Sequence, residues 1–231
     1  MPTKKAPRIT AWSWSRLSKY EGCPGAAKHS FIDKLKDEGG PAMERGRQID
    51  QEAGDYALGK LAKMPASLEL FKEEFEALRI LGAASLQTQV QLAFTSEWKP
   101  TGWFAKDAWC RVVWDMAWRD PKDLSVLRIV DNKSGKVRAE NEAQIKLYAL
   151  AGLLQYPDIE TVDARLWYLD QGESHPDPVV LYTRTHILEL KKYWEKRVKP
   201  MLNDTKFKYT PDWRCNYCPF SQKKKGPCTA A

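Results

Sequence analysis

The sequence predicts an α/β fold in which a mixed central sheet is flanked by helices on both faces. Three observations predict this class. Helical patterns fill the first third of the chain, strand patterns follow them, and one helix separates the middle strands from the last ones. At 231 residues the chain is long enough to bury a sizeable single core.

The N-terminal part of the chain is predicted to be helical after a short arm. Residues 1–11 are expected to form a flexible basic arm, and residues 12–85 a helical region. Ser13 or Ser15 can cap its first helix, because a serine hydroxyl accepts a backbone N–H that the first turn leaves unpaired. The predicted helices cover residues 13–36, with an interruption near Cys23-Pro24-Gly25, and residues 43–60 and 66–84.

The α/β core is predicted over residues 86–204. Runs of apolar, β-branched and aromatic residues bounded by turn residues indicate strands, and apolar residues at helical spacing indicate helices. A Pro- and Gly-containing connection follows the first strand, where Trp98 or Trp103 could be exposed and stack on unpaired bases. The predicted strands cover residues 86–94, 109–119, 126–133, 162–169 and 179–183, the helices 139–155 and 185–203, and the connections 99–108, 120–123 and 171–178.

Two acidic residues lie in neighbouring predicted strands. Asp115 stands in an apolar run that is typical of a strand buried on both faces, where a carboxylate is costly unless a cation or hydrogen bonds compensate it. Asp131 precedes Lys133 by two residues, so their side chains point to the same face, roughly 7 Å apart at ~3.3 Å rise per residue. A carboxylate is a hard ligand for Mg²⁺ or Mn²⁺, and an ammonium can stabilise charge on phosphorus.

Gln144 and Tyr148 lie four residues apart in the predicted helix 139–155 and therefore share one face. Each feature alone has an ordinary explanation. The stretch Asp131-Asn132-Lys133-Ser134-Gly135 favours a turn, a strand aspartate can pair with a basic residue, and Gln and Tyr at this spacing occur in many helices. Their joint occurrence, in order and at short separations, favours a site for metal-dependent phosphodiester cleavage.

Cysteines give a second signal. Cys215, Cys218 and Cys228 form a three-ligand group near the C-terminus, and Cys23, at the end of a predicted helix, is the natural fourth ligand. Four thiolates complete a tetrahedral zinc site or a cubane iron–sulfur cluster, and the spacing does not separate the two. Either would join the two ends of the chain and contribute folding free energy.

The rest of the cysteine pattern agrees with a metal rather than with disulfides. Cys110 lies in an apolar strand and is expected to be a small core residue. The cysteine count, five, is odd, and no signal peptide or transmembrane run is recognised. The last segment, residues 205–231, is expected to be a cysteine-containing tail that packs with Cys23.

These motifs resemble the PD-(D/E)XK nuclease superfamily, in the RecB-like branch that includes phage exonucleases and the CRISPR-associated iron–sulfur nuclease. The segments that begin at Trp14 and Trp213 are similar to the usual start and end of that branch, so the resemblance runs from about residue 12 to residue 228. The residues that fall on the acid, acid-x-Lys and Gln-x3-Tyr motifs are Asp115, Asp131, Lys133, Gln144 and Tyr148.

The resemblance implies a restriction-endonuclease-like fold and a divalent-metal-dependent DNA exonuclease of recombination, repair or phage DNA processing. Asp115 and Asp131 are expected to bind Mg²⁺ or Mn²⁺ together with Asp50 and the carbonyl of Asn132. Lys133 is expected to position or activate the attacking water, and the Gln and Tyr of the third motif to organise the substrate phosphate or this lysine. For the cysteine group the resemblance favours a [4Fe–4S] cluster on Cys23, Cys215, Cys218 and Cys228 over structural Zn²⁺.

The residue at position 50 departs from the family pattern and leaves a second interpretation open. Asp50 stands where the family has a metal-binding His, and an acid there can still bind Mg²⁺ or Mn²⁺. The same substitution could weaken activity. The alternative is therefore a catalytically impaired nuclease-fold DNA-binding protein, or a nuclease subunit that is active only in a complex.

The charge balance suits a polyanionic partner. Lys and Arg total 37 against 30 Asp and Glu, a net charge of +7, which is compatible with binding single-stranded DNA or duplex ends. Lys223-Lys224-Lys225 can contact a phosphate backbone or can simply be solvated. We also expect a recombination or helicase partner protein and no membrane partner. The expected location is the cytoplasm, which is that of the host if the protein is viral.

Overall fold

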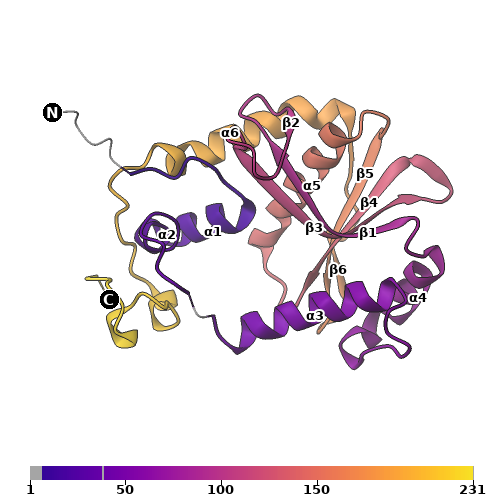
Figure 1. Ribbon diagram of the computed structural model, residues 1–231, viewed down its shortest axis with the longest axis horizontal. Helices are drawn as coiled ribbons and strands as arrows, with labels where there is room; N and C mark the ends of the chain where they lie inside the picture. The colour runs from indigo at the N-terminus through magenta and orange to yellow at the C-terminus, as the bar shows by residue number, and fades with distance from the viewer. Residues whose placement is uncertain (1–6, 38, 231) are drawn as a thin grey trace.

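The computed structural model describes residues 7–37 and 39–230, which contain a seven-stranded sheet in the order β2-β1-β3-β4-β5-β6, with β7 also paired to β5 (Figure 1). Only β4 and β5 run parallel among these paired strands, and α5 connects them as a crossover helix. The predicted mixed sheet is confirmed. The strands are β1 (Leu86–Phe94), β2 (Pro100–Thr101), β3 (Cys110–Asp120), β4 (Asp123–Lys133), β5 (Thr161–Tyr168), β6 (Glu173–His175) and β7 (Leu181–Thr183).

Helices cover both faces of the sheet. In Figure 1, α3 and α4 lie below the sheet, and α5 and α6 lie above it. The α-helices are α1 (Trp14–Gly22), α2 (Pro24–Phe31), α3 (Pro41–Ala57), α4 (Lys72–Leu81), α5 (Glu142–Gln155) and α6 (Ile187–Asn203). Short 3₁₀ helices are η1 (Ala66–Phe71), η2 (Ala139–Asn141), η3 (Arg184–His186), η4 (Trp213–Asn216) and η5 (Gln222–Lys224).

Two apolar clusters form the two sides of the core, and neighbouring residues of β4 point into different ones. Ile129 packs with α5 and α6, whereas Val130 packs with Ile49 of α3 and Phe75 of α4. At Gly152, α5 approaches the sheet closely, because an added Cβ would lie only 2.9 Å from Leu127 Cδ2. This packing fixes the position of the α5 side chains that face β4.

The N-terminal segment is tied directly to the start of β3. The Trp12 N–H donates to the Trp109 carbonyl at 2.8 Å, and the Arg111 N–H donates to the Trp12 carbonyl at 2.9 Å. Ser13 then caps α1, its hydroxyl accepting the Arg16 N–H at 3.4 Å. The expected interruption near Cys23 is present, because α1 ends there and Pro24 opens α2.

Several elements differ from the sequence prediction. The connection 171–178 contains β6, because a turn with Gly172 at φ +68° folds the chain back so that His175 pairs with Leu166 of β5. Strand β2 was likewise expected to be part of a connection. Of the two tryptophans that could be exposed, Trp98 is 4% exposed and its indole N–H donates to Glu195 at 2.9 Å, whereas Trp103 is half-buried.

The ends of the chain are described in part. Residues 1–6 of the predicted arm and residue 231 of the predicted tail lie outside the described residues. Within residues 7–37 and 39–230, no helix has the length and apolar character to span a bilayer.

Candidate functional site

The predicted catalytic residues meet where β3 and β4 separate. The antiparallel pairing of these strands extends to Met116 and Val130, and one further step in the same register brings Asp115 beside Asp131. Beyond this point the Asn132 N–H donates to the Asp115 carboxylate at 2.8 Å instead of to a backbone carbonyl of β3. The side chain of Asp115 therefore occupies the fork between the two strands.

Asp131 is the centre of the polar network. It is 4% exposed, and its Oδ1 accepts hydrogen bonds from Gln144 Nε2 at 3.0 Å and from the Tyr148 hydroxyl. Its other oxygen, Oδ2, forms an ion pair with Lys133 Nζ. The helical spacing of Gln144 and Tyr148 thus presents both donors to one carboxylate oxygen.

Asp50 reaches the same group of charges from α3, on which Ile49 and Ala53 are buried against the sheet. Burial and, after it, the charge of Asp131 raise the pKa of Asp50 to about 6, although Lys133 opposes both effects. An electrostatic coupling of this kind requires the three side chains to be near one another. The structure therefore brings Asp50, Asp115, Asp131, Asn132 and Lys133 to one place.

The site holds more negative charge than its own groups compensate. The pKa of Asp115 is raised well above its ordinary value by burial and by the charges of Asp131 and Asp50. Burial lowers the pKa of Lys133, but the surrounding carboxylates, Asp131 foremost, outweigh this and leave it raised. Three carboxylates thus surround one ammonium.

This donor set fits a hard divalent cation. Across the described ranges, no three His, Cys, Asp or Glu side chains are already arranged as a metal-binding group. The fit therefore depends on chemistry, because carboxylate oxygens are the ligands that Mg²⁺ and Mn²⁺ prefer. A cation would offset the burial and the mutual repulsion that together raise the pKa values of Asp50 and Asp115. Asp131 Oδ2 has no hydrogen-bond donor among the described residues besides its ion-pair partner.

Replacing Asp50 with Asn is expected to raise the melting temperature of the metal-free protein above pH 6. The folded-state pKa of Asp50 is about 6, against an ordinary value of 3.8. Between these values the unfolded chain loses its proton while the folded chain keeps it, so stability falls as the pH rises through this window. The Asp50→Asn variant lacks this loss of stability. Thermal melts in EDTA from pH 4 to pH 8 measure the difference in melting temperature between the variant and the parent.

The control for this prediction is Asp55→Asn on the same helix, which removes an exposed ion pair with Lys60 at 2.9 Å. This control is expected to melt no higher than the parent protein at any pH. A difference in melting temperature between Asp50→Asn and the parent that stays constant from pH 4 to pH 8 would contradict the raised pKa assigned to Asp50.

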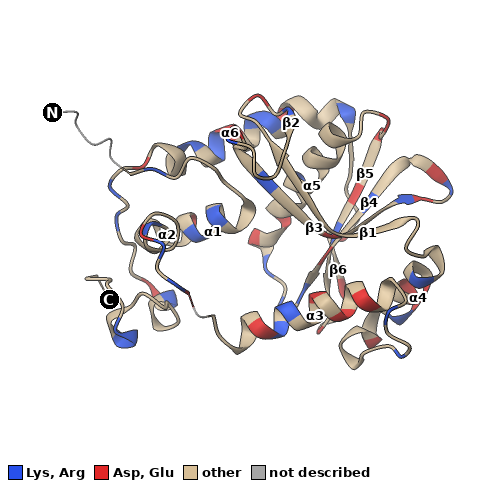
Figure 2. Ribbon diagram, in the orientation of Figure 1, with Lys and Arg blue, Asp and Glu red and all other residues tan. Residues whose placement is uncertain are grey.

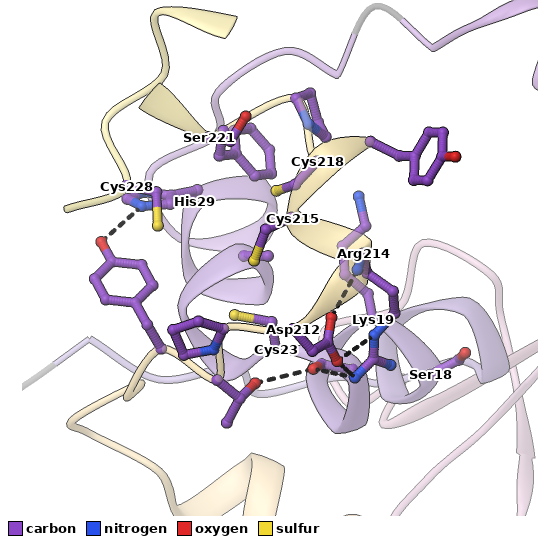
Figure 3. Close-up of a pocket in the computed structure, with 18 of the residues that line it drawn as sticks. Ser18, Lys19, Cys23, His29, Asp212, Arg214, Cys215, Cys218, Ser221 and Cys228 are labelled. Carbon is purple, nitrogen blue, oxygen red and sulfur yellow. Dashed lines mark hydrogen bonds and ion pairs between the residues drawn. The ribbon is translucent and has the colours of Figure 1, made fainter. Parts of the chain in front are cut away.

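The four cysteines expected to bind metal line one cavity of about 1180 Å³ between the α1–α2 junction and the C-terminal tail. Figure 3 shows the thiols of Cys23, Cys215, Cys218 and Cys228 directed into this space. Burial raises the pKa of Cys218, and the other three cysteines add to this shift, as expected of thiols that stand close together. Cys110 lies apart, fully buried in the core, as predicted.

His29 and Tyr209 hold the tail beside this cysteine cavity. His29 is buried, its Nδ1 lies 2.9 Å from Asp33 Oδ2, and its Nε2 lies 3.0 Å from the Tyr209 hydroxyl. The Tyr209 ring covers Gly25, where a Cβ would lie 2.1 Å from Tyr209 Cδ1. A glycine is therefore needed for the tail to pack against α2.

Replacing Gly25 with Ala is expected to lower the free energy of unfolding by about 1–3 kcal/mol, because the new methyl group overlaps the Tyr209 ring. Chemical denaturation measures the change. Gly102→Ala is the matched control, since its added Cβ would make only an ordinary contact, 3.8 Å from Ala105 Cβ. Equal stability of the two variants would show that the tail does not pack on α2 in this way.

The sequence interpretation did not single out two arginines near the site. Arg16 of α1 and Arg111 of β3 line a smaller cavity of about 330 Å³ together with Gln144 and Tyr148. They are far apart in the sequence, and the main-chain pairing of Trp12 with the start of β3 helps to bring them together. The sequence did contain one indication that Arg111 lies near the site, because this residue precedes Asp115 by four positions in the same predicted strand.

Comparisons with known proteins agree with this geometry. The family model described as "PD-(D/E)XK nuclease superfamily" matches residues 111–222, a segment that includes Asp115, Asp131, Lys133, Gln144 and Tyr148. No curated protein matches the chain significantly.

Two solved structures resemble nearly the whole chain. One, named a "putative exonuclease" from Eubacterium rectale, has a TM-score of 0.50 and 14% identity, over 96% of this chain and 90% of the other. The second, SSO0001, has a TM-score of 0.41 and 14% identity, over 97% and 88%. At this identity the first shows a shared fold. The family match covers the strands and helix that build the site, and it identifies residues 111–222 of this chain as a PD-(D/E)XK nuclease superfamily domain.

Proposed function

We propose that the chain is a divalent-metal-dependent DNA exonuclease. The observation that supports this most directly is the group of Asp115, Asp131 and Lys133 at the fork between β3 and β4. The match of residues 111–222 to the superfamily model supports the reaction class, hydrolysis of a phosphodiester bond. DNA recombination, repair or phage DNA processing is the setting that we propose for it.

Each residue of the group has a role in this proposal. Asp115 and Asp131 hold Mg²⁺ or Mn²⁺, with Asp50 as a third carboxylate and the Asn132 carbonyl as a further oxygen donor. Such a cation, when bound, polarises the phosphoryl oxygen and lowers the pKa of a bound water. Lys133 supplies an ammonium that orients the attacking water and stabilises negative charge developing at phosphorus.

Gln144 and Tyr148 act as positioning residues for Asp131. Both donate to the same carboxylate oxygen, which leaves Oδ2 directed at Lys133. From the sequence, Gln144 and Tyr148 were expected to organise the substrate phosphate or Lys133. Their hydrogen bonds support a different role, which is to orient the carboxylate of Asp131.

DNA as the substrate is supported by the distribution of charge. Basic positions predominate along α6, and acidic positions along α3, which carries Asp50 (Figure 2). A polyanion approaching the molecule is therefore attracted along α6, while the carboxylates near α3 need a cation before a phosphate can come close.

The cysteine cavity is proposed to hold a [4Fe–4S] cluster, with Zn²⁺ as the alternative. Cys23 comes from the α1–α2 junction, and Cys215, Cys218 and Cys228 come from the tail. Four thiols directed into one space suit either metal. The role is structural, because the metal would fasten the tail to the helices that begin the fold.

The direct test is incubation with end-labelled single- and double-stranded DNA in Mg²⁺, Mn²⁺ or EDTA. Progressive shortening from an end, in the presence of a divalent metal alone, is the expected result. Covalently closed circular DNA is the matched control, because an exonuclease leaves it intact. Cleavage of the circle, or cleavage in EDTA, would contradict the proposal.

A second candidate rests on Asp50. If this carboxylate replaces a metal-binding His at the cost of activity, the protein is a DNA-binding nuclease fold or a subunit that needs a partner protein. Tight DNA binding without cleavage in any divalent metal, together with cleavage gained in Asp50→His, would favour this candidate. Cleavage by the parent protein that Asp50→His does not increase would exclude it.

A further inference from the structure

A second cavity adjoins the candidate active site on the α1 side. Its volume is about 330 Å³, and one of its walls contains Gln144 and Tyr148, the same two residues that hold Asp131. The opposite walls come from the start of α1 and the start of β3, including Trp103 in the connection before β3. The cavity is therefore separated from the catalytic carboxylates by a single pair of side chains.

The guanidinium groups of Arg16 and Arg111 line this cavity, and neither has a carboxylate partner in the part of the chain that the structure describes. Arg16 Nη1 donates to the Ala11 carbonyl at 3.0 Å, and Arg111 Nε donates to the Trp103 carbonyl at 2.9 Å. No ion pair within residues 7–37 and 39–230 involves either arginine. Each guanidinium thus uses a neutral carbonyl and keeps further N–H donors.

The two arginines repel each other. Burial lowers the pKa of Arg16, and the positive charge of Arg111 lowers it further. The fold nevertheless keeps them together, because the main-chain bonds between Trp12 and β3 attach the start of α1 to the strand that carries Arg111. An anion between them would remove this repulsion.

Both side chains are also held in place by aromatic rings. The Arg111 guanidinium lies 5.8 Å from the centre of the Trp103 ring, and that of Arg16 lies 5.2 Å from the centre of the Phe31 ring. Such stacking reduces the freedom of a guanidinium, so less entropy is lost when it binds an anion. Two fixed planar donor groups suit the several oxygens of a phosphate better than one carboxylate.

We propose that Arg16 and Arg111 form a binding site for a phosphate group of the DNA strand, next to the bond that is cleaved. This inference rests on the proposed function for the identity of the strand, but the pocket itself follows from the two guanidiniums and the cavity. The phosphate is either the terminal one at a strand end or an internal diester. Both offer the same oxygens, so the chemistry alone does not separate them.

The test is DNA binding measured without cleavage, by fluorescence anisotropy in EDTA. The variants are Arg16→Gln, Arg111→Gln and the pair, and the matched control is Arg119→Gln at the other end of β3, which loses an exposed ion pair with Asp158. Each pocket variant is expected to bind roughly tenfold more weakly than the parent. The slope of log affinity against log salt concentration is expected to decrease by about one for each arginine that is replaced. The control is expected to bind like the parent.

Oligonucleotides with a 5′-phosphate, a 3′-phosphate or hydroxyl groups at both ends distinguish the sources. A larger loss with one phosphorylated end assigns the pocket to that terminal phosphate, and an equal loss with all three assigns it to an internal one. The proposal would be overturned if Arg16→Gln and Arg111→Gln each bound every oligonucleotide with the same affinity as Arg119→Gln.

Folding of the variants is checked by a second measurement. Inorganic phosphate is expected to raise the melting temperature of the parent protein and not that of the double variant, since only the parent has the site. An equal rise in both proteins would also overturn the proposal. Because neither readout needs cleavage, a parent protein that fails to degrade DNA would refute the exonuclease function while leaving the phosphate site to be decided by these experiments.

Discussion

Replacing Lys133 with Met is expected to reduce the rate of DNA cleavage by roughly 10²–10³-fold, the usual effect of removing one group that stabilises developing charge. Lys133 forms the ion pair with Asp131 and also counters the charges of Asp50 and Asp115. Methionine keeps the length and most of the volume of the side chain, so the packing beside β4 is preserved. Single-turnover cleavage of end-labelled DNA in Mn²⁺ measures the rate.

Lys136→Met is the matched control for this substitution, because Lys136 lies on the exposed loop three residues after Lys133. It is expected to cleave DNA at the parental rate. The two variants are also expected to bind DNA similarly in EDTA, so a fall in rate for Lys133→Met reports on the chemical step. Full activity in Lys133→Met would remove the ammonium from the mechanism, whatever metal is bound.

The strands that build the site were predictable because the types of their side chains indicate which positions are buried. β3 and β4 are apolar runs interrupted at Asp115 and Asp131, and a buried charge in such a run needs a compensating group nearby. β6 gave no such signal. Glu173, Ser174 and His175 are polar, and they form a strand only because the Gly172 turn returns them to β5.

Residues whose role depends on a distant partner were harder to find. By sequence alone, Asp50 lies on a helix face indistinguishable from a solvated one, and only the family resemblance singled it out. Trp98 stands in a Pro- and Gly-containing connection that indicates exposure, yet Glu195 of α6 accepts its indole N–H and the ring is buried. The pairing of Arg16 with Arg111 likewise depends on a tertiary contact, which local patterns do not encode.

Replacing Cys218 with Ser is expected to reduce the metal content of the purified protein to near zero and to lower its melting temperature by on the order of 10 °C. Cys218 lines the same cavity as the other three cysteines, and burial, followed by the nearness of these cysteines, raises its pKa. Without a metal, burial and mutual repulsion of thiolates oppose the packing of the tail against α2. Elemental analysis of anaerobically purified protein, its visible absorption and thermal melts measure the three quantities.

Cys110→Ala separates loss of a ligand from loss of a core side chain. Cys110 is fully buried away from the cavity, so this variant is expected to melt lower through lost packing while keeping its metal. Iron, sulfide and visible absorption in the parent would identify a [4Fe–4S] cluster, and colourless, zinc-containing protein would identify the alternative. If the parent contains neither metal, or Cys218→Ser retains as much metal as Cys110→Ala, the four thiols do not form a metal site, and the tail is held by contacts such as those of His29 and Tyr209 alone.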